Sequence, residues 1–136
     1  MLIDPVSVVH SFLAAINAHN PTQIFHLMTE DHLFVDSLGS SIRGRDEMRK
    51  AWVAYFYMIP DFTVDVEEMF QRGTDIALFG AAHGTYSVDG TLPRENRWSM
   101  PAAWRVVVRD GRVAEWHTYA DNEPVRRIMA ARNPGQ

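Results

Sequence analysis

The sequence contains no cysteine, which removes several kinds of chemistry at once. Disulfides, thiolate nucleophiles and cysteine-ligated metal sites are excluded. Basic residues are also sparse: the chain has 13 Lys and Arg against 17 Asp and Glu, and its formal net charge is −4. Nucleic acid rewards a basic protein face, so we expect no nucleic-acid partner. The lack of cysteine also fits a reducing compartment, and we expect a cytoplasmic protein.

Long apolar runs are missing as well. No run approaches the length that spans a bilayer, so no membrane partner is expected. Residues 6–18 are apolar enough to resemble the centre of a signal peptide, but the first basic residue of the chain is Arg43. A signal peptide carries basic residues before its apolar stretch. We therefore interpret residues 6–18 as a helix of the mature domain.

Apolar and aromatic residues are abundant in this chain. It has 136 residues, 46% of them hydrophobic, and includes seven Phe, four Trp and four Tyr. That length suits one domain with a core of its own. So many aromatic side chains indicate a well-filled core or an aromatic-lined cavity. No linker or repeat interrupts the chain, and we predict a single domain over residues 1–136.

Capping residues mark three helices in the first half of the chain. Asp4-Pro5 and Asn20-Pro21 each combine a capping side chain with proline at the first helical position. A third helix begins near Asp46, and Pro60 ends it. A short strand ending near Asp36 lies between the second and third helices, followed by a turn-rich segment over residues 37–44.

After Pro60 the apolar period changes from helical to alternating, which predicts strands. The alternation slips at residues 68–70, which indicates a bulge. Three further strands are predicted at about 75–87, 97–109 and 112–120, with Asp110-Gly111 forming a tight hairpin. Residues 123–132 suggest a short basic helix or a tail. Helices segregated from an antiparallel sheet define the α+β class.

Several segments of the chain, in this order and spacing, resemble the nuclear transport factor 2-like superfamily, within it the SnoaL-like and ketosteroid-isomerase-like branch. These segments are residues 12–20 (FLAAINAHN), 32–39 (HLFVDSLG), 43–46 (RGRD), 84–86 (GTY), 109–116 (RDGRVAEW) and 119–121 (YAD). The resemblance implies a cone-shaped fold in which three N-terminal helices pack in a curved, mostly antiparallel sheet. It also implies an apolar pocket and a homodimer. The fold alone does not fix a reaction.

Asp36 is the first candidate catalytic residue. By resemblance it occupies the general-base position of ketosteroid isomerases, where a carboxylate moves a proton between carbons next to a carbonyl. The alternative is that Asp36 caps the turn over residues 37–39. His32 has the same strand parity as Asp36 and is a candidate to share its face.

Asp121 is the second candidate, because SnoaL-like cyclases use an acid–base Asp on the final strand. It could equally cap the last helix, because Asp121-Asn122-Glu123-Pro124 is a good cap sequence. His117 has the opposite strand parity to Trp116 and is expected on the outer sheet face.

Two related activities lack their residues here. Ketosteroid isomerases hold the enolate oxygen with a Tyr and a protonated Asp. The matching positions of this chain are Phe12 and Ala102, and neither side chain can donate a hydrogen bond. Epoxide hydrolases of this fold use an Arg-x-Asp set that residues 98–102 do not contain.

The predicted ligand-contacting residues combine aromatic rings with small strand residues. They are Phe12, Phe34, Trp52, Tyr55, Phe56, Trp98, Met100, Ala102 and Trp116. Gly80, Ala82 and Gly84 share one face of a strand and leave space beside Ala102, which either neighbouring rings or a ligand would fill. An apolar interior suits a flat hydrophobic ligand.

The sequence therefore predicts a SnoaL-like small-molecule pocket protein. As an enzyme it would be a cofactor-free isomerase, cyclase or lyase that uses a pocket Asp as acid–base on a hydrophobic carbonyl compound. The alternative is a non-catalytic ligand-binding or dimerisation module of the same fold. No histidine pair has metal-ligand spacing, so no metal is expected. The outer sheet face, with Arg105, Val107, His117 and Tyr119, is the predicted dimer interface.

Overall fold

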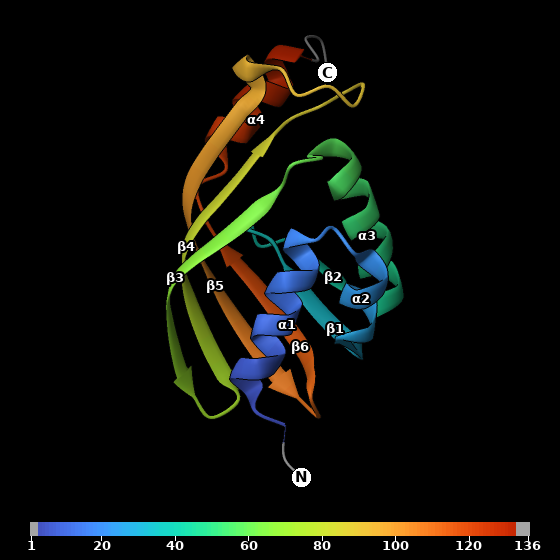
Figure 1. The fold of residues 1–136 in the computed structure, drawn as a ribbon, viewed down its shortest axis with the longest axis vertical. Helices are drawn as coiled ribbons and strands as arrows, with labels where there is room; N and C mark the ends of the chain where they lie inside the picture. Colours follow the sequence, from blue (N-terminus) through green and yellow to red (C-terminus); the bar gives the residue numbers. More distant parts are fainter. Residues whose placement is uncertain (1–2, 133–136) are drawn as a thin grey trace.

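A computed structural model describes residues 3–132 of the chain (Figure 1). Its elements, in chain order, are α1 (Pro5–Asn17), α2 (Pro21–His26), β1 (Met28–Val35), β2 (Ser41–Arg43), α3 (Arg45–Met58), β3 (Thr63–Arg72), β4 (Asp75–Thr85), the 3-10 helix η1 (Arg94–Asn96), β5 (Arg97–Arg109), β6 (Arg112–Tyr119) and α4 (Glu123–Arg132). In this part of the chain no helix is long and apolar enough to cross a membrane.

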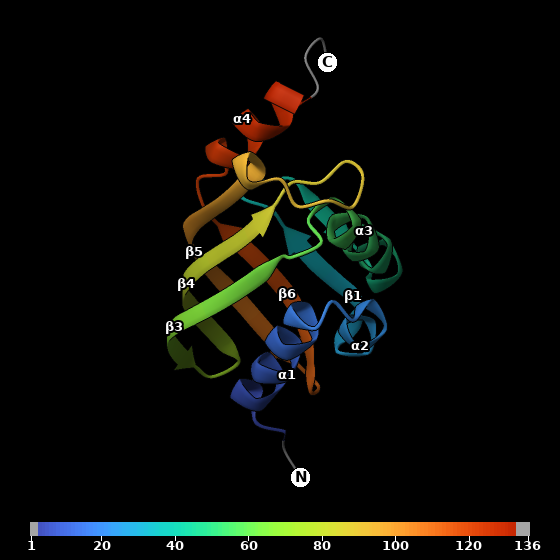
Figure 2. The same cartoon turned by 45° about the horizontal axis from the view of Figure 1, so that its top comes forward.

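The strands form one curved sheet in the order β2-β1-β6-β5-β4-β3. Every neighbouring pair is antiparallel except β1 and β6, which run parallel. Helices α1, α2 and α3 lie on the concave side of this sheet, and α4 lies at the end of the molecule away from the N-terminus (Figures 1 and 2). The predicted α+β class, with three N-terminal helices in a mostly antiparallel sheet, is confirmed.

The first two helices begin where their caps predict. The Asp4 side chain accepts a hydrogen bond from the Val6 amide at 3.1 Å, and the Asn20 side chain accepts one from the Gln23 amide at 3.1 Å. In both helices proline follows the cap and lacks the amide hydrogen that a first turn leaves unpaired. The Asp110-Gly111 hairpin also forms, with both residues at positive φ (54° and 72°).

The first strand is longer than predicted. β1 begins at Met28 rather than near Phe34, and the turn-rich segment contains the short strand β2. The pairing of β1 with β6 is irregular between Met28 and Leu33, and the intervening Glu30 and Asp31 are exposed. Because two adjacent acids break the apolar alternation, the sequence pattern does not reveal this strand.

β3 contains a bulge, but it lies between Val66 and Glu68, where the register with β4 shifts, rather than within residues 68–70 as predicted. Gly80 sits opposite, and a Cβ there would collide with the backbone oxygen of Asp65. A Cβ at Gly84 would collide with Ile59. The space expected at these two glycines is therefore filled by a strand backbone and by side chains.

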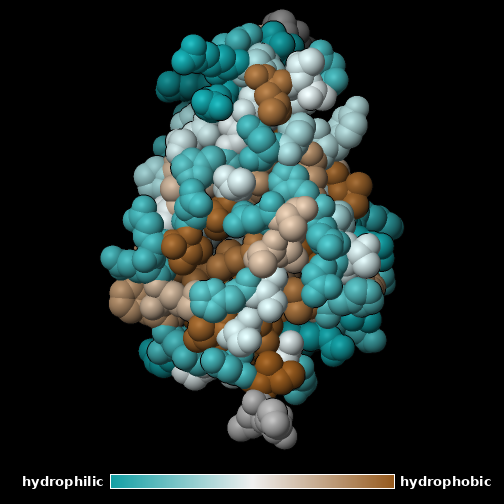
Figure 3. Space-filling view, viewed as in Figure 1, coloured by the Kyte–Doolittle hydropathy of each residue, from teal (hydrophilic) through white to brown (hydrophobic). Residues whose placement is uncertain are grey.

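The interior lies between the helices and the concave face of the sheet, where Phe12, Ile16 and Ile24 are fully buried. The surface in the view of Figure 3 is mostly hydrophilic, and apolar side chains gather over β3 and β4 and beside α1. Phe70 and Phe79 are exposed on these strands, with their rings in edge contact at 5.9 Å. The concave interior and the exposed apolar face are therefore separate features.

Candidate functional site

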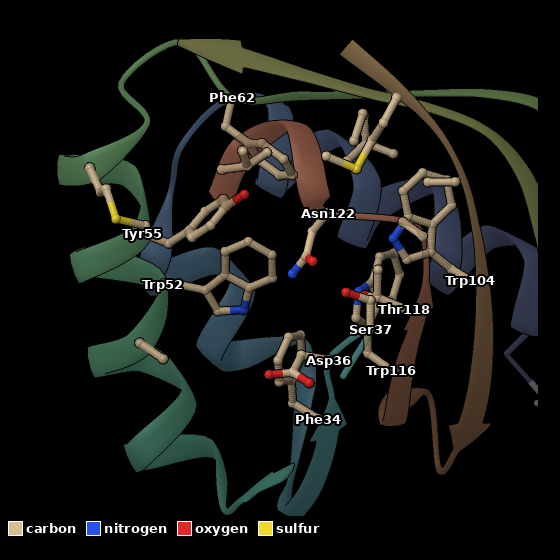
Figure 4. Close-up of a pocket in the computed structure, with 18 of the residues that line it drawn as sticks. Phe34, Asp36, Ser37, Trp52, Tyr55, Phe62, Trp104, Trp116, Thr118 and Asn122 are labelled. Atoms are coloured by element: carbon tan, nitrogen blue, oxygen red, sulfur yellow. The ribbon is translucent and has the colours of Figure 1, made fainter. Parts of the chain in front are cut away.

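A cavity of about 360 Å³ opens on the concave side of the sheet (Figure 4). All four tryptophans of the chain line it. Helix α3 supplies Trp52 and Tyr55 to one wall, and strand β5 supplies Trp104 to the wall across from them. Asn122, from the segment after β6, lies between these walls.

Most of the predicted ligand-contacting residues lie on this cavity. Those that line it are Phe34, Trp52, Tyr55, Trp98, Met100, Ala102 and Trp116. Phe12 and Phe56 are buried in the core instead: Phe12 packs on Trp116 at 5.2 Å between ring centroids, and Phe56 stacks on His19 at 4.3 Å. Neither is among the residues that line the cavity.

The predicted ligand contacts omit part of the wall, although Ala82 was expected beside the space. The further lining residues are Ser37, Met48, Ala51, Met58, Phe62, Val64, Ala82, Trp104, Thr118, Ala120, Asn122, Val125, Arg126 and Met129. Strand parity with Trp116 could have identified Thr118 and Ala120. Nothing in the sequence pattern indicates that α4 turns its side chains toward this cavity.

Asp36 caps the turn after β1 and also lies on the wall of the cavity. Its Oδ1 accepts hydrogen bonds from the amides of Leu38 and Ser40, each at 2.9 Å, and so holds the turn after β1. The same residue lines the cavity. Its Oδ2 has no hydrogen bond to any described residue, which leaves one carboxylate oxygen for a molecule in the cavity.

His32 lies in the core rather than on the cavity wall. It is fully buried, and its Nδ1 donates a hydrogen bond to the Val113 carbonyl at 2.7 Å. Its Nε2 has no partner. Burial lowers the pKa of His32, so this ring is held neutral. His32 shares the strand parity of Phe34 and so lies on the same face of β1. Its ring lies beside the buried Phe12, with 6.4 Å between ring centroids.

Asp121 is exposed and is not among the lining residues. Its Oδ1 accepts a hydrogen bond from the Glu123 amide at 3.0 Å, which caps α4. The next residue, Asn122, is the one that enters the cavity. Of the three carboxylate and imidazole candidates, only Asp36 is therefore brought to the cavity.

Hydrogen-bond donors dominate the polar groups of this wall. The indole N–H groups of Trp52 and Trp98 are buried and have no partner. Burial raises the pKa of the Tyr55 phenol, which therefore keeps its proton, and its hydroxyl points into the cavity in Figure 4. The arrangement joins one carboxylate acceptor to several donors in an apolar space, which suits proton transfer next to a ligand oxygen.

Other polar groups gather on the outer face of the sheet. His83 bridges the hydroxyl of Ser99 (2.8 Å) and the carboxylate of Asp65 (2.9 Å). The sequence reading did not find this set, which depends on the register of three strands. On β6, His117 pairs with Glu115 at 2.8 Å on the same outer face, as strand parity predicts. None of these residues lines the cavity.

Residues 3–132 contain no group of three His, Asp or Glu side chains arranged to hold a metal ion. A second hollow lies near the β5–β6 hairpin and is lined by charged side chains that pair with one another, among them Arg109 with Asp31 and Arg45 with Glu30. These ions satisfy each other at the surface. The aromatic cavity is therefore the candidate site.

A family model described as a SnoaL-like domain matches residues 9–116. No curated protein matches the sequence at a significant level. Many solved structures share the fold, among them two proposed polyketide cyclases and an LEH-like epoxide hydrolase. A proposed polyketide cyclase from Streptomyces antibioticus has 22% identity and a TM-score of 0.76, over 94% of this chain and 99% of that chain.

A proposed SnoaL-like polyketide cyclase from Shewanella denitrificans has 13% identity and a TM-score of 0.79, over 93% of this chain and 97% of that one. An LEH-like epoxide hydrolase from M. tuberculosis has 16% identity and a TM-score of 0.76, over 96% of each chain. At these identities the likeness shows the shared fold, which confirms the fold family expected from the sequence.

Proposed function

The chain belongs to the SnoaL-like domain family, and on this premise we propose that its cavity binds a flat, hydrophobic carbonyl compound on which Asp36 acts as acid–base. The reaction class is a cofactor-free isomerisation, cyclisation or elimination. The observation that carries the proposal is the free Oδ2 of Asp36, a residue on the wall of a mostly apolar, Trp-rich cavity. The polyketide cyclases among the structural neighbours support it, since cyclisation of such compounds begins at a carbon next to a carbonyl.

The proposed step is a proton transfer. Asp36 Oδ2 takes a proton from the carbon next to the carbonyl, and the electron pair of that C–H bond becomes the double bond of an enolate. The protonated carboxyl then returns the proton to carbon. Because Oδ1 is held by two amides, the carboxylate keeps a fixed direction while Oδ2 reacts.

The proposal is tested with 2-tetralone, a two-ring ketone with acidic C–H groups. In D2O the protein should speed exchange of the protons next to the carbonyl above the buffer rate, measured by NMR. Asp36→Asn keeps the Oδ1 acceptor for the turn but loses the base, and should lower the exchange rate about 100-fold or more. Asp121→Asn is the matched control, because it removes a carboxylate that caps α4 outside the cavity.

Exchange no faster than in buffer, or an equal loss in both variants, would contradict acid–base action by Asp36. Binding of 2-tetralone without exchange would favour the alternative, a non-catalytic carrier of a hydrophobic ligand. One observation favours that alternative: Phe12 and Ala102 stand where ketosteroid isomerases carry their oxyanion donors, and neither side chain can donate.

A further inference from the structure

Two indole N–H groups on the cavity wall have no hydrogen-bond partner. Trp52 and Trp98 are 7% and 5% exposed, and the Nε1 atom of each is buried without an acceptor. Native proteins leave few buried donors unpaired, because an unpaired donor loses its water and gains nothing in return. Both residues line the cavity, so an acceptor atom of a bound molecule would satisfy them once a small shift of the wall exposes the nitrogen.

The Trp52 ring is held in place by its neighbours on α3. Phe56 stacks against it with 5.3 Å between ring centroids, and Tyr55 meets it edge-on at 6.4 Å. In Figure 4 the nitrogen edge of Trp52 is turned toward the end of the cavity where Asp36 lies. A donor fixed in this way loses little freedom when it binds an acceptor, as an oxyanion donor requires.

No described residue accepts a hydrogen bond from the Trp52 indole. Asp36 directs Oδ1 to the turn amides, and no hydrogen bond joins its carboxylate to the indole. The matching oxyanion positions of the ketosteroid-isomerase branch, Phe12 and Ala102, carry no donor. Of the two unpaired indole donors on the wall, Trp52 on α3 is the one whose nitrogen edge is turned toward this base in Figure 4.

We propose that the Trp52 N–H binds the carbonyl oxygen of the ligand and stabilises the enolate oxygen that forms when Asp36 removes the neighbouring proton. The inference rests on the proposed function and narrows the ligand class. The ligand is a flat ketone that presents its oxygen to Trp52 and an acidic C–H to Asp36. No atom is transferred to Trp52: its N–H stays intact, and the proton moves between carbon and Asp36 alone.

The first test compares binding of 2-tetralone with that of tetralin, the same two rings without the oxygen. Wild-type protein should prefer the ketone by roughly tenfold, the worth of one good hydrogen bond in a dry site. Trp52→Phe keeps an aromatic ring on α3 and removes only the N–H, and it should abolish the preference while tetralin binds as before. In 15N spectra the Trp52 indole signal should move downfield with the ketone only.

The second test is the tetralone exchange rate. Loss of one oxyanion donor lowers turnover by roughly 100-fold, so Trp52→Phe should reduce the maximal rate more than the apparent affinity. Tyr57→Phe is the matched control, because it removes a donor from the exposed side of α3, outside the cavity, and should keep the preference and the rate. Tyr55→Phe and Trp98→Phe each remove another donor of the wall and show whether either one, rather than Trp52, holds the ligand oxygen.

The outcomes separate this inference from the proposed function. Asp36-dependent exchange that persists in Trp52→Phe, with the ketone preference intact, overturns the role of Trp52 and leaves the proposed function standing. Loss of the preference in Trp98→Phe or Tyr55→Phe alone also overturns it. No exchange and no tetralone binding in wild-type protein overturns the proposed function itself. If Trp52→Phe does not fold, the indole signals of wild-type protein decide, with Trp52 assigned from the three other Trp→Phe variants.

Discussion

Among residues 3–132, His32 is the one buried histidine, and its environment makes it a pH-sensitive residue. Its Nδ1 is bound to the Val113 carbonyl, while Nε2 faces apolar neighbours without a partner. Burial lowers the pKa of this ring below its ordinary value of 6.5, and it outweighs the opposite influence of Asp31 and Glu115. Protonation would place a charge at Nε2 with no group to accept its hydrogen.

Acid should therefore weaken the fold through His32. Below about pH 6.5 the unfolded chain takes up a proton that the folded chain refuses, so the free energy of unfolding falls as pH drops, by up to about 1.4 kcal/mol per pH unit. Above that pH the ring is neutral in both states and contributes no slope. Urea unfolding at several pH values between about 7.5 and 5.5 should show a smaller slope in His32→Phe than in wild type.

The exposed His26 provides the control, because His26→Gln should keep the wild-type slope. Equal slopes in His32→Phe and wild type would show that other groups cause the acid sensitivity. The prediction for His32 does not involve Trp52 or Asp36, so His32→Phe should leave the pH dependence of ligand binding unchanged.

Residue by residue, the sequence predicted the composition of the site better than its geometry. Asp36 could be predicted to cap a turn and to line the pocket, and the structure shows both placements. The sequence could not predict that Asp121 caps α4 while Asn122 enters the cavity, because a single turn of backbone decides which of the two side chains does which. Unpaired indole donors are equally invisible in a sequence.

Among the elements, those with a local signal were predictable. Helix starts follow from Asp4 and Asn20, and the last hairpin follows from Asp110-Gly111. The length of β1 was underestimated, because its pairing with the distant β6 extends the strand past two exposed acids that break the apolar pattern. The position of α4 across the cavity depends on contacts with residues far away in the sequence, so local patterns cannot give it.

The bulge between β3 and β4 leads to a prediction about Gly80. The shifted register brings the Asp65 carbonyl against this glycine, where a Cβ would collide with backbone. Gly80→Ala should lower the free energy of unfolding by roughly 2–4 kcal/mol, because a paired strand has little room to move. Urea denaturation measures this change.

Gly84→Ala is the matched comparison on the same strand. Its Cβ would meet the side chains of Ile59 and Trp98, which can rearrange more easily than a backbone carbonyl. We expect a smaller loss of stability than for Gly80→Ala. The reverse order would show that packing around Gly84 is stiffer than the bulge, and that the bulge adapts.

At the scale of the whole molecule, the order of the segments identified the fold, while the reaction remains a proposal. The same curved sheet with helices on its concave side serves in neighbours named as cyclases and as an epoxide hydrolase. Chemistry therefore depends on a few side chains inside the cavity. The convex face is a separate matter, since Phe79 and Tyr119 are exposed there and no element of residues 3–132 covers them.

We propose that this convex face joins two copies of the chain in a homodimer. Phe79, Ala103 and Tyr119 lie in one row across β4, β5 and β6, and Phe79 and Tyr119 are 46% and 57% exposed. A sheet face packed on its symmetry mate would bury this row, and a stable interface needs about 800 Å² from each partner.

Wild-type protein at micromolar concentration should therefore show twice the protomer mass in light scattering, and Phe79→Glu should show the protomer mass. In the dimer, a charged side chain at position 79 would lie against the apolar row of the partner subunit, whereas in the monomer it would lie in solvent. The substitution should therefore separate the subunits without unfolding them. Tyr57→Glu, on the exposed side of α3, should stay dimeric. A monomeric wild-type protein would rule out the dimer. A dimeric Phe79→Glu variant would place the subunit contact on another surface. Because the cavity lies on the concave face, tetralone affinity should be the same in both assembly states.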